Sequence, residues 1–349
     1  MASSSDLVLI TGGSSFIGLH ALHQALQQGF RVRTTIRNEA KRSLIEAALK
    51  DYDASLDYTA IEYAHADLLS DAGWDDAARG ARYVLHVASP FPAAQPKDEM
   101  ELIRPAREGT LRVLRAAKRT GTCTRVVVTS SVAAVAYGNT PSEAGVFTEA
   151  DWTNVDGPHV SAYVKSKTLA EQAAWDFVKS DEGSGLELAT VNPVGVFGPP
   201  MRPEDGSTTC DIVKALLKGE IPLAPRIGFG IVDVRDVASL LLLAMVRPEA
   251  NGERYLATAA PQAMSLLECG AALRSGLGQA ASRTPTRELP DWFVRFGARF
   301  SGQLKAAADN LGKQGDVSNE KARALGWAPK TPEEALVATG QRFIDKGFC

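Results

Sequence analysis

The start of the chain carries the pattern that most constrains its fold. Residues Asp6–Ile10 read as a short buried strand that runs directly into Thr11-Gly-Gly-Ser-Ser-Phe-Ile-Gly18, and an apolar-periodic helix follows. This order predicts a phosphate-binding unit, because Gly12 permits a tight turn and Gly18 lets the helix lie close to the sheet. The alternative is a glycine-rich turn of the kind found in any α/β protein.

The middle position of this motif departs from the usual pattern, since it holds Ser15. Gly13 and Ser14 beside it keep the loop small. A serine side chain there either hydrogen-bonds a phosphate or crowds it, and the sequence leaves both outcomes open.

Short apolar strands alternate with helical patterns through the first half of the chain. The alternation predicts an α/β fold of Rossmann type, a doubly wound parallel sheet with helices on both faces. The predicted strands are 6–10, 30–37, 58–63, 82–88, 125–130 and 186–192, and predicted helices are 39–50, around 76, 98–119, 159–180 and 332–346. We expect residues 1–192 to bind the dinucleotide and carry the catalytic groups. Residues 193–349 are expected to be mainly a smaller substrate-binding region, in which about 228–260 return to the sheet.

Several small or polar segments follow the predicted strands directly. They are the glycine loop, Ala88–Ser89, Ser131 and Pro193. Ligands of doubly wound sheets bind beyond the carboxyl ends of the strands, so we expect these segments to converge in space.

Tyr163 and Lys167 lie four residues apart in a helical pattern, so their side chains share one helix face. We expect the charge of Lys167 to lower the pKa of Tyr163, from the ordinary tyrosine value near ~10, enough for proton transfer at neutral pH. The pair indicates an enzyme that moves a proton at a carbonyl or an alcohol. The same spacing also occurs by chance on solvated helix faces, so it gains weight only from the glycine motif.

The second predicted strand ends in Arg37, and Lys41 follows one helical turn later. Sites that accept only NAD usually place a carboxylate at this point for the ribose 2′-hydroxyl, whereas an arginine suits a 2′-phosphate. The absence of an acid here favours NADPH. The alternative is that both residues are ordinary solvated charges.

Composition excludes several other classes of protein. The chain has 349 residues, 45% hydrophobic content and a net charge of −3 with the two signs mixed, which gives no indication of a nucleic-acid or membrane partner. No apolar stretch approaches the ~18 residues of a membrane span, and the start lacks a signal-peptide pattern, so we expect a cytoplasmic protein. The four cysteines, Cys123, Cys210, Cys269 and Cys349, have no metal-type spacing, and we expect each to be a small buried thiol. No metal site is predicted.

These motifs are similar to those of one family. The chain resembles the extended short-chain dehydrogenases/reductases, and within them the dihydroflavonol 4-reductase-like carbonyl reductases, over nearly its whole length. The matching segments are Thr11–Gly18, Val32–Arg37, Ala66–Leu68, His86–Pro90, Val128–Ser131, Glu149–Trp152, Tyr163–Glu171, Asn192–Pro193, Phe197–Pro199, Val232–Ala238, Gly252–Tyr255 and Leu325–Trp327. Two positions depart from it: Ser15, and Glu108, where many relatives carry an asparagine.

The resemblance implies a role for each matching residue. Ser131 would hydrogen-bond the substrate carbonyl oxygen, Tyr163 would protonate it, and Lys167 would hold the nicotinamide ribose and stabilise the phenolate. Ser130 is a rival for the role of Ser131, and Asp67 has an ordinary strand-end turn as its alternative. The implied cofactor contacts are Thr11, Gly12, Ser15, Phe16, Ile17 and Gly18 at the pyrophosphate, Arg37 and Lys41 at the 2′-phosphate, Asp67 and Leu68 at the adenine, Val87, Ala88 and Ser89 along the middle, and Pro193 and Val196 beside the nicotinamide.

The substrate is less constrained than the cofactor. A small, largely apolar aldehyde or ketone suits a second half without a basic cluster. Candidate lining residues, each also explicable as plain core or loop, are Phe91, Pro92, Tyr137, Val160, Met201, Arg202 and Phe229. A set of aromatic residues at helical spacing (Trp292, Phe293, Phe296 and Phe300) is interpreted as a packed helix face rather than a substrate clamp.

Two other classes stay open. One is a nucleotide-sugar epimerase or dehydratase with tightly bound NAD, against which Arg37 argues. The other is a non-catalytic dinucleotide-sensing protein, against which the presence of both Tyr163 and Lys167 argues. The chain is expected to be a monomer or a homodimer, since the helices predicted at 98–119 and 159–180 often pair between subunits in the family it resembles.

Overall fold

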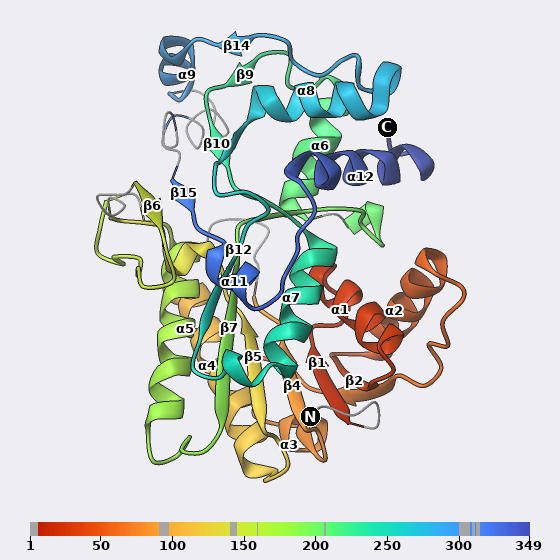
Figure 1. Ribbon diagram of the computed structural model, residues 1–349, viewed down its shortest axis with the longest axis vertical. Coiled ribbons are helices and arrows are strands. Elements are labelled where there is room, and N and C mark those ends of the chain that lie inside the picture. Colours follow the sequence, from red (N-terminus) through yellow and green to blue (C-terminus); the bar gives the residue numbers. More distant parts are fainter. Residues whose placement is uncertain are drawn as a thin grey trace.

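A parallel sheet of seven strands lies at the centre of the protein (Figure 1). The computed structural model describes residues 6–90, 98–139, 145–158, 160–205, 207–299, 308, 311 and 315–349. In spatial order the strands are β12 (Arg254–Ala257), β7 (Glu187–Pro193), β5 (Arg125–Thr129), β4 (Tyr83–His86), β1 (Leu7–Thr11), β2 (Arg31–Ile36) and β3 (Glu62–His65). All six pairings are parallel, so the predicted doubly wound fold is confirmed.

Helices cover both faces of this sheet. One face packs against α1 (Phe16–Gln27), α2 (Glu39–Tyr52) and α7 (Val234–Val246), and the other against α3 (Trp74–Ala78), α4 (Met100–Arg119) and α5 (Ala162–Lys179). The alternation of side chains along β1 explains the two cores, because Val8 and Ile10 belong to the first and Leu7 and Leu9 to the second. Every residue of β1 is buried, as expected for an inner parallel strand.

The remaining elements follow mainly after β7. The helices are α6 (Thr208–Lys218), α8 (Leu266–Leu277), α9 (Asp291–Gly297), α11 (Glu320–Ala324) and α12 (Pro332–Asp345), with 3-10 turns η1 (Val132–Ala134), η2 (Pro203–Asp205), η3 (Pro248–Ala250) and η4 (Gly278–Ala281). Short strands pair as β6 (Val146–Phe147) with β15 (Asp316–Val317), β8 (Gly195–Phe197) with β11 (Ile231–Asp233), β9 (Ala224–Pro225) with β14 (Glu288–Leu289), and β10 (Gly228–Phe229) with β13 (Met264–Ser265). Helices α6, α8 and α12 share a third apolar core at one end of the molecule (Figure 1).

Most predicted elements lie within a few residues of the observed ones, but the third strand begins later than expected. The predicted strand started at Tyr58, whereas β3 starts at Glu62. Asp57 accepts hydrogen bonds from the backbone and hydroxyl of Thr59, and the amide of Ile61 bonds to the carbonyl of Tyr58, so this stretch forms a turn. Tyr58 and Ile61 made this stretch resemble a strand, but their side chains are buried in the core and anchor the turn.

The aromatic residues of α9 are exposed rather than packed. Trp292 is 69% exposed, Phe293 46% and Phe296 55%, so the interpretation as a packed helix face is wrong for these three. Phe300 lies outside the described residues. The spacing of the aromatic residues therefore predicted a helix correctly, but it did not predict that their side chains are exposed.

The cysteines agree with only part of what the sequence suggested. All four cysteines are free thiols; Cys210 and Cys269 are buried as expected, whereas Cys123 is half-buried and Cys349 is exposed. Within the described ranges, no helix is both long enough and apolar enough to cross a bilayer.

Candidate active site

The glycine turn packs tightly against the end of β4. Gly12 has φ +71°, and a Cβ built there would lie 2.8 Å from both the backbone nitrogen and the Cα of Ala88. A Cβ on Gly18 would lie 2.2 Å from the carbonyl oxygen of Gly12, so α1 meets the turn as closely as backbone atoms allow. Only glycine fits these two positions, which leaves a cradle of backbone at the N-terminus of α1 that suits a pyrophosphate.

Ser15, the residue that departs from the usual motif, is the N-cap of α1. Its hydroxyl donates to the carbonyl of Gly12 at 2.7 Å and accepts from the amide of Gly18 at 3.1 Å. The side chain therefore holds the loop together internally, as N-cap serines do. Phe16 and Ile17 follow as the first two residues of α1.

A chain of buried hydrogen bonds connects the ends of β1 and β4 to α4. The amide of Ala88 donates to the Thr11 hydroxyl at 3.1 Å, and that hydroxyl lies 2.8 Å from Nδ1 of His86. His86 Nε2 lies 3.4 Å from the Thr110 hydroxyl, which donates to the carbonyl of Ala106. Burial lowers the pKa of His86 to about 3, so the ring is neutral, and the pattern fits a proton on Nε2.

The side chain of Thr11 is therefore turned into the protein. The whole residue is buried. Sequence reasoning assigned no role to His86; its position in the segment His86–Pro90, directly after a strand, was the signal that pointed to it.

Ser131 and Tyr163 are brought together as expected. Ser131 follows β5 and caps η1, and its hydroxyl is a hydrogen-bond partner of the Tyr163 hydroxyl. Tyr163 lies in the first turn of α5, which begins after the N-cap Ser161. Ser130, the rival residue, points elsewhere, since its hydroxyl donates to Glu171 at 2.5 Å.

The expectation that Lys167 lowers the pKa of Tyr163 is wrong. Burial raises the pKa of the Tyr163 phenol, and the hydrogen bond with Ser131 is what opposes the rise. A phenol with a raised pKa carries its proton at neutral pH, which is the form that a proton donor requires.

Lys167 lies one helical turn further along α5, beside a small cavity of about 10 Å³. Ala88 and Ser89 line the same cavity, and Ala88 also packs against Gly12. Lys167 therefore lies near the glycine turn, with Ala88 between them. Burial lowers the pKa of Lys167 to about 8, while the charge of Glu171 acts in the opposite direction. The ammonium is thus still the main form at neutral pH, because this pKa lies only slightly above neutral pH.

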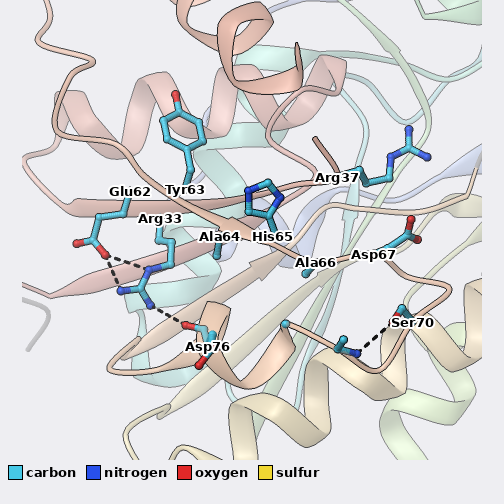
Figure 2. Close-up of a pocket in the computed structure, with 12 residues that line it drawn as sticks. Arg33, Arg37, Glu62, Tyr63, Ala64, His65, Ala66, Asp67, Ser70 and Asp76 are labelled. Carbon is cyan, nitrogen blue, oxygen red and sulfur yellow. Dashed lines mark hydrogen bonds and ion pairs between the residues drawn. The ribbon is translucent and has the colours of Figure 1, made fainter. Parts of the chain in front are cut away.

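A broad depression of about 730 Å³ lies beside β2 and β3, with Arg37 and Asp67 at one end of it and the Arg33–Glu62 ion pair at the other (Figure 2). Arg37 is exposed and directly follows β2. Lys41 is half-buried in the first turn of α2, where its amide donates to the N-cap Asn38. A cation at this end of the depression suits a phosphate.

The other residues predicted to contact a cofactor lie close to the same edge of the sheet. Leu68 follows Asp67 but leans on α4, where a Cβ on Gly109 would lie 2.9 Å from its side chain. Val87 is buried, Pro193 ends β7, and Val196 lies in β8 next to it. The cradle at Gly12 and Gly18 and the exposed Arg37 therefore fit a phosphorylated dinucleotide.

The residues suggested for the substrate pocket do not form one group. Met201 is 3% exposed within the first core, so the structure places it in the packing rather than in a pocket. Arg202 pairs with Glu204, and Phe229 stacks on Phe197 with ring centroids 5.8 Å apart. Tyr137 is near Tyr163, since its charge would act on the pKa of that residue, and a Cβ on the next residue, Gly138, would lie 3.0 Å from Val160. Phe91 and Pro92 are outside the described residues.

Comparison with known proteins decides the family. The sequence profile described as "NAD dependent epimerase/dehydratase family" matches residues 8–257. This chain belongs to that family. The resemblance to extended short-chain dehydrogenases/reductases is confirmed, because relatives within the family are named as reductases.

Two curated relatives and one solved structure illustrate this. Cinnamoyl-CoA reductase CAD2 of Medicago truncatula is 34% identical over 261 residues, which cover 73% of this chain and 78% of that protein. Tetraketide alpha-pyrone reductase 1 of Arabidopsis thaliana is 33% identical over 351 aligned residues, covering 100% of this chain and 98% of the relative. The structure of Gre2 from Candida albicans in complex with NADPH superposes with a TM-score of 0.78 at 26% identity, covering 97% of this chain and 99% of that one.

Proposed function

We propose that this protein uses NADPH to reduce an aldehyde or ketone to an alcohol. The observation that carries the proposal is the hydrogen-bonded pair Ser131–Tyr163, with Lys167 one turn along the same helix, at the sheet edge that also holds the glycine cradle. The names of relatives support the reaction class, since one is a cinnamoyl-CoA reductase and another an NADPH-dependent methylglyoxal reductase.

The cofactor would lie along the carboxyl edge of the sheet. The backbone of Thr11, Gly12, Ser15, Phe16, Ile17 and Gly18 would hold the pyrophosphate, Arg37 and Lys41 the 2′-phosphate, Asp67 and Leu68 the adenine, Val87, Ala88 and Ser89 the middle of the molecule, and Pro193 and Val196 the nicotinamide. When bound there, NADPH supplies a hydride from C4 of the nicotinamide ring.

Ser131 and Tyr163 act on the substrate oxygen. The two hydroxyl groups are hydrogen-bond partners, so a carbonyl oxygen bound beside them would accept a hydrogen bond from Ser131 and the proton from Tyr163. Lys167 would hold the nicotinamide ribose with its ammonium group. The proposal for Tyr163 uses the protonated phenol that burial favours.

The direct test follows the oxidation of NADPH and of NADH with a panel of small apolar aldehydes and ketones. Consumption of NADPH with at least one carbonyl, and slower consumption of NADH, is expected. No consumption of either cofactor would refute the proposal and favour an epimerase, a dehydratase or a dinucleotide sensor.

Arg37→Glu tests the choice of cofactor. The variant places a carboxylate where a 2′-phosphate would bind and where an NAD enzyme holds the ribose hydroxyl. We expect the preference to move from NADPH towards NADH, and an unchanged NADPH preference would remove Arg37 from the site.

We also propose a cytoplasmic location and a monomer or homodimer. The absence of a membrane-spanning helix among the described residues is compatible with the first. Fractionation of cells and light scattering of the purified protein test the two statements separately.

A further inference from the structure

A buried carboxylate lies behind the proposed active site. Glu171 is on α5, one turn beyond Lys167, and its side chain is 0% exposed. Four groups donate to it: Ser130 Oγ at 2.5 Å and Asn192 Nδ2 at 2.7 Å to Oε2, and Arg254 Nε at 2.6 Å and Trp175 Nε1 at 3.2 Å to Oε1. The Thr190 hydroxyl lies 3.2 Å from Oε1 and shares its proton with Asn192 Oδ1 at 2.9 Å. A buried charge is tolerated only with such complete partners.

Apart from Trp175, which lies on α5 itself, the donors to Glu171 lie in or directly after three neighbouring strands. Ser130 follows β5, Asn192 lies in β7, and Arg254 lies in β12. Asn192 uses the same amide nitrogen to donate to the carbonyl of Ser131 at 3.1 Å. Ser131 is therefore held in two ways. Its neighbour Ser130 bonds to Glu171, and its own carbonyl accepts from Asn192, which also bonds to Glu171.

Arg254 is fixed as firmly as its partner. It donates to the carbonyls of Glu149 and Asp151 at 2.8 and 2.7 Å, and its guanidinium lies 3.8 Å from the ring centroid of Trp152. Glu171 thus ties the helix of Tyr163 and Lys167 to a rigid point on the sheet.

Glu171 is also the anion that acts on Lys167. The titratable and charged groups around Lys167 are Tyr163 and Glu171 on its own helix and His86 on β4, with Arg254 of β12 on the far side of Glu171. His86 is neutral, and Tyr163 keeps its proton. Burial favours the uncharged amine, and the charge of Glu171 is what opposes it.

We propose that Glu171 is a positioning residue for the proposed reduction: it fixes the Ser131 end of β5 against the helix that bears Tyr163 and Lys167. The inference deepens the proposed function and rests on it. The carboxylate acts through Ser131 and Lys167 and does not contact the substrate.

Glu171→Gln tests the inference, because glutamine keeps the size of the side chain and removes the charge. We expect kcat to fall on the order of 10- to 100-fold from the displacement of reacting groups. At pH 6.5 the NADPH dissociation constant, measured by fluorescence, stays within about threefold, since Lys167 is still charged there. The pH above which both kcat and NADPH affinity fall moves to a lower value.

Glu187→Gln is the matched control. Glu187 pairs with the buried Arg125 at 2.6 Å at the opposite, amino end of β5 and β7, so its loss removes a comparable ion pair from the same strands. We expect a lower unfolding temperature but an unchanged kcat and pH profile.

Glu171→Asp separates the two actions, because it keeps the charge and shortens the reach. It is expected to lower kcat without moving the pH profile, and it decides the question if Glu171→Gln fails to fold; a wild-type kcat in Glu171→Asp would overturn the positioning role. An active wild type together with a Glu171→Gln variant that behaves like Glu187→Gln would overturn the inference alone. A wild type inactive with every carbonyl would overturn the proposed function and this inference with it.

Discussion

Gly12→Ala tests how the glycine turn is built, and the structure gives its cost. Gly12 has φ +71°, a conformation that costs an L-residue about 1–2 kcal/mol. The added methyl group would also lie 2.8 Å from backbone atoms of Ala88. Ala88 cannot withdraw freely, because its amide is bonded to the buried Thr11 hydroxyl. Forcing the two segments apart adds about 1–3 kcal/mol, the usual cost of overpacking.

Gly80→Ala provides the control. Gly80 has φ +73°, yet a Cβ there would meet nothing within 4 Å, so the variant carries the backbone strain without the clash. We expect urea unfolding to show that Gly12→Ala is less stable than Gly80→Ala by about 1–3 kcal/mol. NADPH affinity, measured by fluorescence, should fall in Gly12→Ala and stay at the wild-type value in Gly80→Ala.

Equal stabilities for the two alanine variants would refute the close approach of the turn to β4. Wild-type NADPH affinity in Gly12→Ala would refute the placement of the pyrophosphate at this turn.

Three further predictions concern the proton donor, its neighbour and the pH profile. Tyr163→Phe should abolish turnover while the NADPH dissociation constant, measured by fluorescence, stays nearly unchanged; measurable turnover would remove Tyr163 from the mechanism. Lys167→Met should impair both turnover and NADPH binding, because it removes the charge proposed to hold the ribose, and normal binding would contradict that role. The pKa of Lys167 is lowered from 10.5 to about 8 by burial, so the charged form is lost as pH rises through that value. The value of kcat/KM should therefore fall above about pH 8, roughly tenfold per unit, and a flat profile to pH 9.5 would show that this charge is not needed.

Local patterns in the sequence were enough for the framework of the protein. The apolar run before Gly12 gave β1 and the turn, because a buried strand and a φ above zero each demand particular residue types at adjacent positions. The spacing of Tyr163 and Lys167 gave a shared helix face, and the strand-end position of Ser131 placed it at the same edge.

Other properties depend on what each residue meets in the folded chain. Ser15 and Thr11 both belong to a sequence motif typical of phosphate binding. In the structure the Ser15 hydroxyl caps α1, and the Thr11 hydroxyl is buried beside His86. The aromatic residues of α9 have helical spacing, yet Trp292 is exposed. The spacing of apolar residues predicts a helix, but it does not predict which other elements pack against that helix.

The sequence by itself determined most strands and helices of the first half of the chain, the glycine turn and the candidate groups Ser131, Tyr163 and Lys167, because short-range periodicity and backbone sterics fix these locally. Only the tertiary structure decided their protonation. Burial raises the pKa of Tyr163 and lowers that of Lys167, and the charge that opposes the latter change sits on Glu171, which is held by donors from β5, β7 and β12. Desolvation and long-range hydrogen bonds exist only once distant segments meet, so no local pattern contains them.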